Sequence, residues 1–90
     1  MNWKISYLKR AVKFLSKQQN TKQSVQDEVV KLIKSFNNEV VSIDFRALKG
    51  EWEGYHRIRK GKIRILVKMD FDNNIVNVYD IDFRGNIYTK

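Results

Sequence analysis

The sequence predicts an α+β domain in which a helical hairpin packs on one face of a small antiparallel sheet. Apolar residues recur at helical spacing through residues 9–36. They alternate with polar residues at residues 2–7 and again in the second half of the chain. The expected element order is β-α-α-β-β-β, and helices segregated from antiparallel strands are typical of an α+β fold. At 90 residues, the chain 1–90 is expected to form one domain.

The first strand and the two helices follow from changes of period. Residues 2–7 place three aromatic or apolar side chains on one face, as in a half-buried strand. Residues 9–18 then form a helix with Val12 and Leu15 in its apolar stripe, to which Leu8 and Ala11 can be added. Thr21, with Ser24, is the expected cap of a second helix that ends at residues 37–38. The short polar link between the helices predicts an antiparallel hairpin.

The second half predicts three strands, at residues 55–60, 62–70 and 75–82. A two-residue loop, Lys60-Gly61, would join the first two, because glycine accepts a positive φ. Residues 72–74 form the next turn. Residues 39–53 receive no assignment, although their apolar side chains must be buried somewhere.

The composition excludes several kinds of site. The chain has no cysteine and one histidine, which rules out a disulfide framework, a thiol nucleophile and a multi-histidine metal site. No apolar stretch is long enough to span a membrane, and the N-terminus lacks a signal-peptide pattern. We expect a cytoplasmic protein with no metal and no small-molecule cofactor. The net charge of +8 favours a nucleic acid or an acidic protein as partner, and a basic surface that serves only solubility is the alternative.

The expected hairpin gathers cations on one face of the sheet. With the loop at residues 60–61, Arg59 faces Lys62 and Arg57 faces Arg64. Like charges in directly opposed positions are destabilising, so this arrangement suggests an anion between them. Arginine grips phosphate with two hydrogen bonds, and the ring of Tyr55 on the same face offers a surface on which a base can stack. The interpretation is a cradle for an RNA backbone.

A lattice of surface ion pairs explains the same cations equally well. If the next strand pairs through a three-residue turn, Asp82 faces Arg64 and neutralises it. His56 falls on the face of Ile58, where a packed histidine is commoner than a catalytic one. Glu51, two residues before Glu53, is weak evidence for a general base when taken alone.

Two segments resemble the RelE/ParE superfamily of toxins. The run LKGEWEGYHRIRKGKIRI at residues 48–65 is similar to the family's Leu-Lys-Gly start, aromatic residue, Arg-Ile-Arg and glycine turn. The ending DFRGNIY at residues 82–88 is similar to the family's closing arginine and tyrosine. Many relatives carry a histidine before that arginine, where this chain has Phe83. The resemblance covers residues 44–88 by motif and the whole chain by element order.

The resemblance implies a toxin of a type II toxin–antitoxin pair, with an acidic antitoxin and the mRNA-loaded ribosome as partners. RelE-like members cut mRNA in the ribosomal A site without metal, by attack of a 2′-hydroxyl on the adjacent phosphate. The catalytic residues implied by position are Arg57, Arg59, Arg64, Tyr88 and, as base, Glu51. Those implied to bind RNA are Tyr55, Lys62, Lys68 and Arg84. Two alternatives remain: a ParE-like inhibitor of DNA gyrase that is not an enzyme, and an inactive homologue that only binds its antitoxin.

Overall fold

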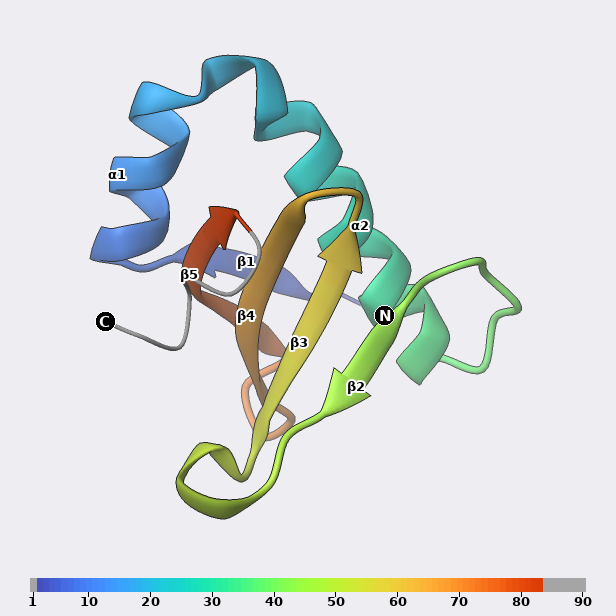
Figure 1. Ribbon diagram of the computed structural model, residues 1–90. Helices are drawn as coiled ribbons and strands as arrows, with labels where there is room; N and C mark the ends of the chain where they lie inside the picture. Colours follow the sequence, from blue (N-terminus) through green and yellow to red (C-terminus); the bar gives the residue numbers. More distant parts are fainter. Residues whose placement is uncertain (1, 84–90) are drawn as a thin grey trace.

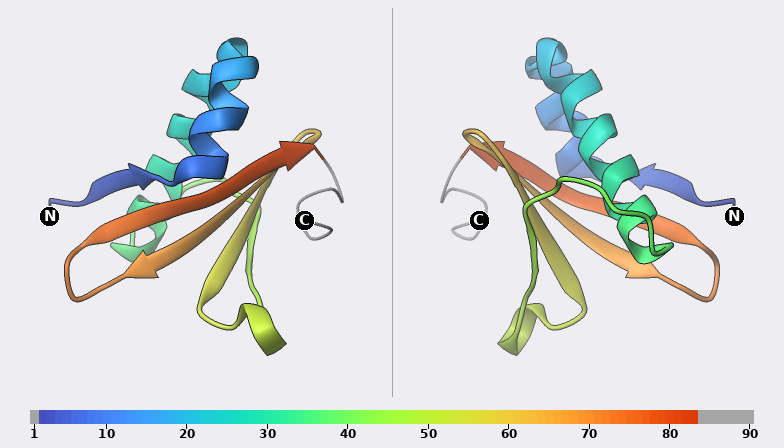
Figure 2. Two further views of the ribbon diagram at one scale, coloured as in Figure 1. Left: turned by 90° about the vertical axis from the view of Figure 1, so that its left-hand side faces the viewer. Right: turned by 90° about the vertical axis from the view of Figure 1, so that its right-hand side faces the viewer.

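Two α-helices pack on one face of a five-stranded sheet in the computed structural model, which describes residues 2–83 (Figure 1). The side views show both helices on the same side of the sheet (Figure 2). The elements are β1 (Lys4–Tyr7), α1 (Lys9–Lys17), α2 (Lys22–Phe36), β2 (Phe45–Ala47), β3 (Tyr55–Lys60), β4 (Ile63–Asp70) and β5 (Ile75–Phe83), with short 3-10 helices η1 (Gln19–Thr21) and η2 (Gly50–Trp52). The expected α+β class and helical hairpin are confirmed. Arg84 and Tyr88 lie outside the described residues.

The sheet has one more strand than the sequence predicts, and one parallel pair. Its order is β1-β5-β4-β3-β2, and β1 runs parallel to β5 while the other neighbours are antiparallel. The sheet is therefore mostly antiparallel, as predicted, with a parallel pair at this edge. A parallel pair needs a long crossover, which the helices and the remaining strands supply. The additional strand, β2, comes from the segment that had no assignment.

The helices bury a narrower stripe than predicted. Ala11 and Leu15 are buried against the sheet, but Val12 is 52% exposed. Val12 follows Ala11 by one residue, which turns it by about 100° around the helix and away from the sheet. Thr21 does not cap α2, because its hydroxyl donates to the carbonyl oxygen of Gln18 at 2.6 Å. No helix within residues 2–83 is long and apolar enough to cross a membrane.

The β3–β4 hairpin turns one residue later than predicted. Lys60 pairs with Ile63, so Gly61 and Lys62 form the loop, and Gly61 has φ of +58°. Arg59 consequently faces Arg64, and Arg57 no longer does. The glycine is still in the loop, but it occupies the first position, where a positive φ suits the twist of a two-residue hairpin. The shift keeps Arg57, Arg59 and Arg64 on their predicted face, whereas Lys62 lies in the loop and no longer faces Arg59.

A β-bulge in β5 keeps the core in register. Leu66 pairs with Asp80 and the next residue, Val67, pairs with Val78, which leaves Tyr79 as the extra residue of β5. The bulge allows Val78 and Ile81 to be fully buried on the helix side, although three positions separate them. The predicted pairing of Asp82 with Arg64 is confirmed, but it arises from a four-residue turn and this bulge.

His56 packs on the helix-covered face, as the alternation in the sequence predicts. Its ring centroid lies 5.4 Å from that of Phe36 and 6.0 Å from that of Phe45. Its Nδ1 atom is buried and has no hydrogen-bond partner in the described part of the chain. Burial lowers the pKa of His56 below its ordinary value of 6.5.

We predict that His56 makes the fold less stable in mild acid. The unfolded chain binds a proton at this position more readily than the folded one. The contribution is therefore fully present above pH 6.5 and is lost as the pH falls toward the lower folded pKa. Urea unfolding of the wild type and of His56→Phe at pH 7.5 and 5.5, values chosen about one unit either side of the ordinary histidine pKa, measures the effect. Parallel losses in the two proteins would rule out His56 as the cause.

Candidate nucleic-acid interface

The face of the sheet opposite the α-helices carries the predicted cations, and the strand registers arrange them in rows. The row nearest the β3–β4 hairpin runs Asp44, Arg59, Arg64, Asp82 across the sheet. Arg59 Nε donates to Asp44 Oδ2 at 2.7 Å, with both side chains 51% exposed. Two opposed arginines are thus flanked by a carboxylate on each side. This Arg59–Asp44 ion pair was not predicted from the sequence, and an exposed pair of this kind contributes about 0–1 kcal/mol.

Arg64 is held by the hairpin turn itself. One terminal guanidinium nitrogen donates to the carbonyl oxygens of Gly61 at 2.8 Å and of Ile63 at 3.1 Å. These bonds position the guanidinium at the hairpin end of the sheet face opposite the α-helices, which we call the bare face. Because Arg57 pairs with the residue two positions after Arg64, the two arginines are diagonal neighbours, about 7–8 Å apart.

The second row has an excess of positive charge. Arg46 of β2 lies directly opposite Arg57 of β3, and Arg57 lies opposite the fully buried Leu66. Within residues 2–83, neither Arg46 nor Arg57 has a carboxylate within ion-pair distance. The Nε of Arg57 is buried and has no hydrogen-bond partner among the residues that the structure describes. Directly opposed like charges destabilise a sheet, and an anion bound between them would remove the repulsion. Within residues 2–83, the Arg46–Arg57 pair is therefore our leading candidate for an anion site.

Arg46 was missed by the sequence analysis. It lies in the segment without an assignment, yet a signal is present: Phe45 and Ala47 flank it in the alternating pattern of a strand. Pairing this short strand with residues 56–58 across the loop places Arg46 beside Arg57. The expected opposed pair, Arg57–Arg64, is therefore replaced by two opposed arginine pairs, Arg59–Arg64 and Arg46–Arg57.

Aromatic side chains gather at the other end of β3. The rings of Trp52, Tyr55 and Tyr79 meet nearly at right angles, with centroids 5.4, 5.6 and 6.2 Å apart. Lys68, which pairs with Tyr55 across the sheet, places its Nζ 5.2 Å from the centroid of the Tyr55 ring. We refer to Trp52, Tyr55 and Tyr79 as the aromatic corner. It lies beside η2, at the bottom of Figure 1.

The remaining predicted residues are dispersed. Glu51 is exposed in η2, at the aromatic end, whereas Arg64 lies at the hairpin end. Tyr55 and Arg59 are four positions apart on β3, a distance of about 13 Å along a strand. Lys62 is exposed in the hairpin loop. Arg57 occupies the middle of the face, between the two ends.

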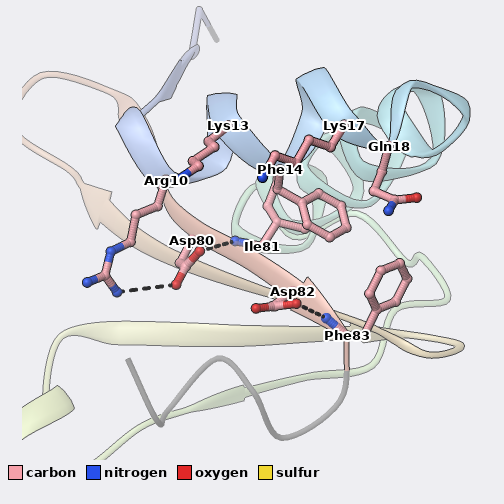
Figure 3. A pocket seen from close by; sticks show the side chains of 9 residues that line it. All are labelled: Arg10, Lys13, Phe14, Lys17, Gln18, Asp80, Ile81, Asp82 and Phe83. Atoms are coloured by element: carbon pink, nitrogen blue, oxygen red, sulfur yellow. Dashed lines mark hydrogen bonds and ion pairs between the residues drawn. The ribbon is translucent and has the colours of Figure 1, made fainter.

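A cavity of about 440 Å³ lies at a different place, between α1 and the end of β5 (Figure 3). Arg10 of α1 approaches the buried Asp80, with a nitrogen–oxygen distance of 3.6 Å. The other carboxylate oxygen of Asp80 accepts a hydrogen bond from the backbone of Ile81 at 2.9 Å. Lys13 and Lys17 also line the cavity. β1 pairs with β5 only as far as Val78, so this part of the β5 edge is left to α1 and its cations.

The architecture is that of the RelE-like toxins, a class of small α+β proteins. No known family model matches the sequence, and no curated protein is detectably similar in sequence. Solved structures do match over nearly the whole chain. The toxin–antitoxin complex RelBE2 of Mycobacterium tuberculosis contains a chain that is 20% identical, with a TM-score of 0.67 over 93% of this chain and 100% of that one.

Two further structures agree. A copper-bound mutant toxin from Helicobacter pylori is 16% identical, with a TM-score of 0.74 over 97% of this chain and 100% of its own. The archaeal RelE–RelB complex of Pyrococcus horikoshii contains a chain 18% identical, with a TM-score of 0.68 over 96% of this chain and 99% of that one. At these identities the comparisons establish the shared fold.

We predict that the Arg46–Arg57 pair is unfavourable until an anion binds. Arg57→Met keeps the unbranched stem and removes the charge, so it should stabilise the protein by roughly 0.2–1 kcal/mol in low salt. Inorganic phosphate should raise the thermal midpoint of the wild type more than that of Arg57→Met. Lys60→Met is the matched control, because Lys60 is on the same strand and lines a hollow beside α2. Equal phosphate effects in wild type and Arg57→Met would argue against an anion site.

Proposed function

We propose that this protein is the toxin of a type II toxin–antitoxin pair and that it cleaves mRNA on the ribosome. The observation that carries the proposal is the opposed pair Arg46–Arg57 on a sheet face that no α-helix within residues 2–83 covers. Such a pair is suited to a phosphate group, and the aromatic corner beside it is suited to a base. The fold, shared with RelE-like toxins, supports the same conclusion. Ribosomal action would take place in the cytoplasm.

The proposed reaction is a transesterification within the RNA. The 2′-oxygen forms a bond to the adjacent phosphorus while the bond from phosphorus to the 5′-oxygen of the next nucleotide breaks. A base takes the proton of the 2′-hydroxyl, and an acid gives one to the leaving oxygen. The products are a 2′,3′-cyclic phosphate and a 5′-hydroxyl. Arg57 and Arg46 would stabilise the charge that develops on the phosphate, with Arg64 as their diagonal neighbour.

Few side chains are candidates for the general base and the general acid of this reaction. Glu51 remains the leading candidate for the base, and Tyr88 for orienting the nucleotide or assisting proton transfer. Arg59 is engaged by Asp44 and would have to leave that ion pair to contact RNA. His56 lies on the opposite face of the sheet. The ribosome would hold the mRNA in a reactive geometry, which lowers what the toxin's own side chains must supply.

A gyrase-binding function is the second candidate, and one observation favours it. Within residues 2–83, the imidazole is on the helix side, and Glu51 lies at the aromatic end rather than with Arg64. A bare cationic face without a base beside it would serve as a binding surface. An inactive homologue that only binds its antitoxin would share this property.

The partner we propose is an acidic antitoxin. Structures with this fold include complexes of RelE with RelB and of YoeB with YefM. The net charge of +8 would steer an acidic segment to the protein. Two surfaces would receive it: the bare face around Lys62 and Arg64, and the β5 edge lined by Lys13 and Lys17.

Brief expression followed by mapping of mRNA 5′ ends tests the cleavage. We predict new ends that carry a 5′-hydroxyl, on ribosome-bound message and not on the same RNA free in solution. Arg57→Ala should reduce cleavage by about 10²–10³-fold, the effect of removing one preorganised charge-stabilising contact. Lys60→Ala, on the same strand but beside α2, should cleave normally.

Two outcomes would contradict the proposed function. Efficient cutting of free RNA would contradict the need for a ribosome. An absence of new 5′ ends, together with inhibition of supercoiling by purified gyrase, would establish the second candidate instead.

Salt dependence tests the acidic partner. We predict that association with the cognate antitoxin slows as ionic strength rises, because steering between opposite charges is screened. Reversing two cations, in the double variant Lys62→Glu with Arg64→Glu, should slow association further. Stopped-flow association rates at several salt concentrations provide the measurement. Rates that ignore both salt and charge reversal would count against an acidic partner on this face.

A further inference from the structure

The aromatic corner has a geometry that the core does not require. The hydrophobic core is built on the helix side of the sheet, where Ile58, Ile65 and Val78 are fully buried. Trp52, Tyr55 and Tyr79 lie on the opposite side and are only partly buried. Three large rings with remaining exposed area, on a face that also carries cations, form a surface that a ligand can reach.

Two backbone features assemble this corner. The bulge at Tyr79 lets it share the bare face with the next residue, Asp80, so that its ring reaches Tyr55 at 5.6 Å. Gly54, with φ of +94°, turns the chain between η2 and β3, which brings Trp52 back to within 5.4 Å of Tyr55. An ordinary residue at Gly54 would be strained in this conformation. Both bulge and turn are local departures from regular structure that bring rings together.

We infer that the aromatic corner binds one unpaired base of a single-stranded RNA whose adjacent phosphate lies on Arg57. Every base has a π-face, so stacking on an aromatic ring is available to any sequence. Tyr55 and Arg57 are two residues apart on one face of β3, so their Cα atoms are about 6.5–7 Å apart. The base and the phosphate of one nucleotide would therefore be held by neighbouring positions of a single strand. The inference rests on the proposed function, because it deepens the same site.

Charge distribution assigns the base to the aromatic end and the phosphate to the centre of the face. Glu51 and Glu53 flank Trp52 in the chain and are both exposed, which disfavours a phosphate beside that ring. The ammonium group of Lys68 lies over the Tyr55 ring, so its charge is already engaged by the face of an aromatic ring. An uncharged, flat group suits such surroundings better than an anion does. An acidic peptide, the other class of partner with affinity for a basic face, gains nothing from the three rings beyond apolar contact.

The two tryptophans of the chain allow a direct test. Trp3 packs against the core and Phe71, so Trp3→Phe leaves Trp52 as the only tryptophan. Single-stranded oligoadenylate of about six nucleotides, within the usual site size of single-strand binding modules, is titrated into this variant. We expect saturable quenching of Trp52 fluorescence, because a stacked base contacts the indole. Inorganic phosphate and polyglutamate, which have no base, should leave the emission unchanged.

Matched variants then separate stacking from charge. In the Trp3→Phe background, Tyr79→Leu should weaken oligoadenylate binding between about 5-fold and about 150-fold, the loss expected when one stacking ring is removed. Tyr79→Phe keeps the ring and should bind normally. Phe71→Leu, which removes an exposed ring at the helix-side cluster, should also bind normally. Circular dichroism checks that each variant is folded. If Tyr79→Leu does not fold, the quenching of Trp52 in Trp3→Phe alone still tests the inference.

The outcomes separate this inference from the nuclease proposal. Quenching without mRNA cleavage supports the aromatic corner and removes the nuclease. Cleavage with no quenching of Trp52, or with unchanged oligoadenylate affinity in folded Tyr79→Leu, overturns the aromatic corner and leaves the nuclease in place. Equal quenching by polyglutamate also overturns it, in favour of a peptide-binding surface.

Discussion

Both α-helices pack on the same face of the five-stranded sheet, so each strand must direct its apolar residues to that face and alternate residues to the other. A slip of one residue would reverse the two sets. In β5 the apolar positions change phase between Val78 and Ile81, and the bulge at Tyr79 absorbs the extra residue. The buried side of the sheet thereby remains continuous, and Arg46, Arg57 and Arg64 lie on the bare side.

The bare face divides its cations into two kinds. In the row nearest the hairpin, Arg59 is paired with Asp44, and the row ends in a carboxylate at each side. In the next row, Arg46 and Arg57 oppose each other, and Asp80, the carboxylate that β5 contributes to this row, is approached by Arg10 of α1. A directly opposed like-charge pair costs only about 0.2–1 kcal/mol, so a stable core can tolerate it. A phosphate between the two guanidinium groups would reverse the sign of this interaction.

Along β3, the face changes character from one end to the other. Aromatic rings and two exposed glutamates mark the η2 end, and arginines flanked by aspartates mark the hairpin end. The middle holds the opposed arginines Arg46 and Arg57, which form no ion pair within residues 2–83. A nucleotide has the same polarity, with a flat uncharged base and a charged phosphate. This correspondence explains why a basic surface on so small a domain would favour a nucleic acid over a generic polyanion.

The sequence by itself determined which face of the sheet the side chains of β3 occupy. Alternation along a strand is a local property, so the cations around Arg57 and the packed His56 could both be assigned in advance. Register was decided only by the tertiary structure, because it depends on hydrogen bonds between segments distant in the chain. A hairpin loop one residue later exchanged the partner of Arg57 from Arg64 to Leu66. The pairing of β2 brought in Arg46, and the bulge placed Tyr79, because neither local period contains information about the neighbouring strand.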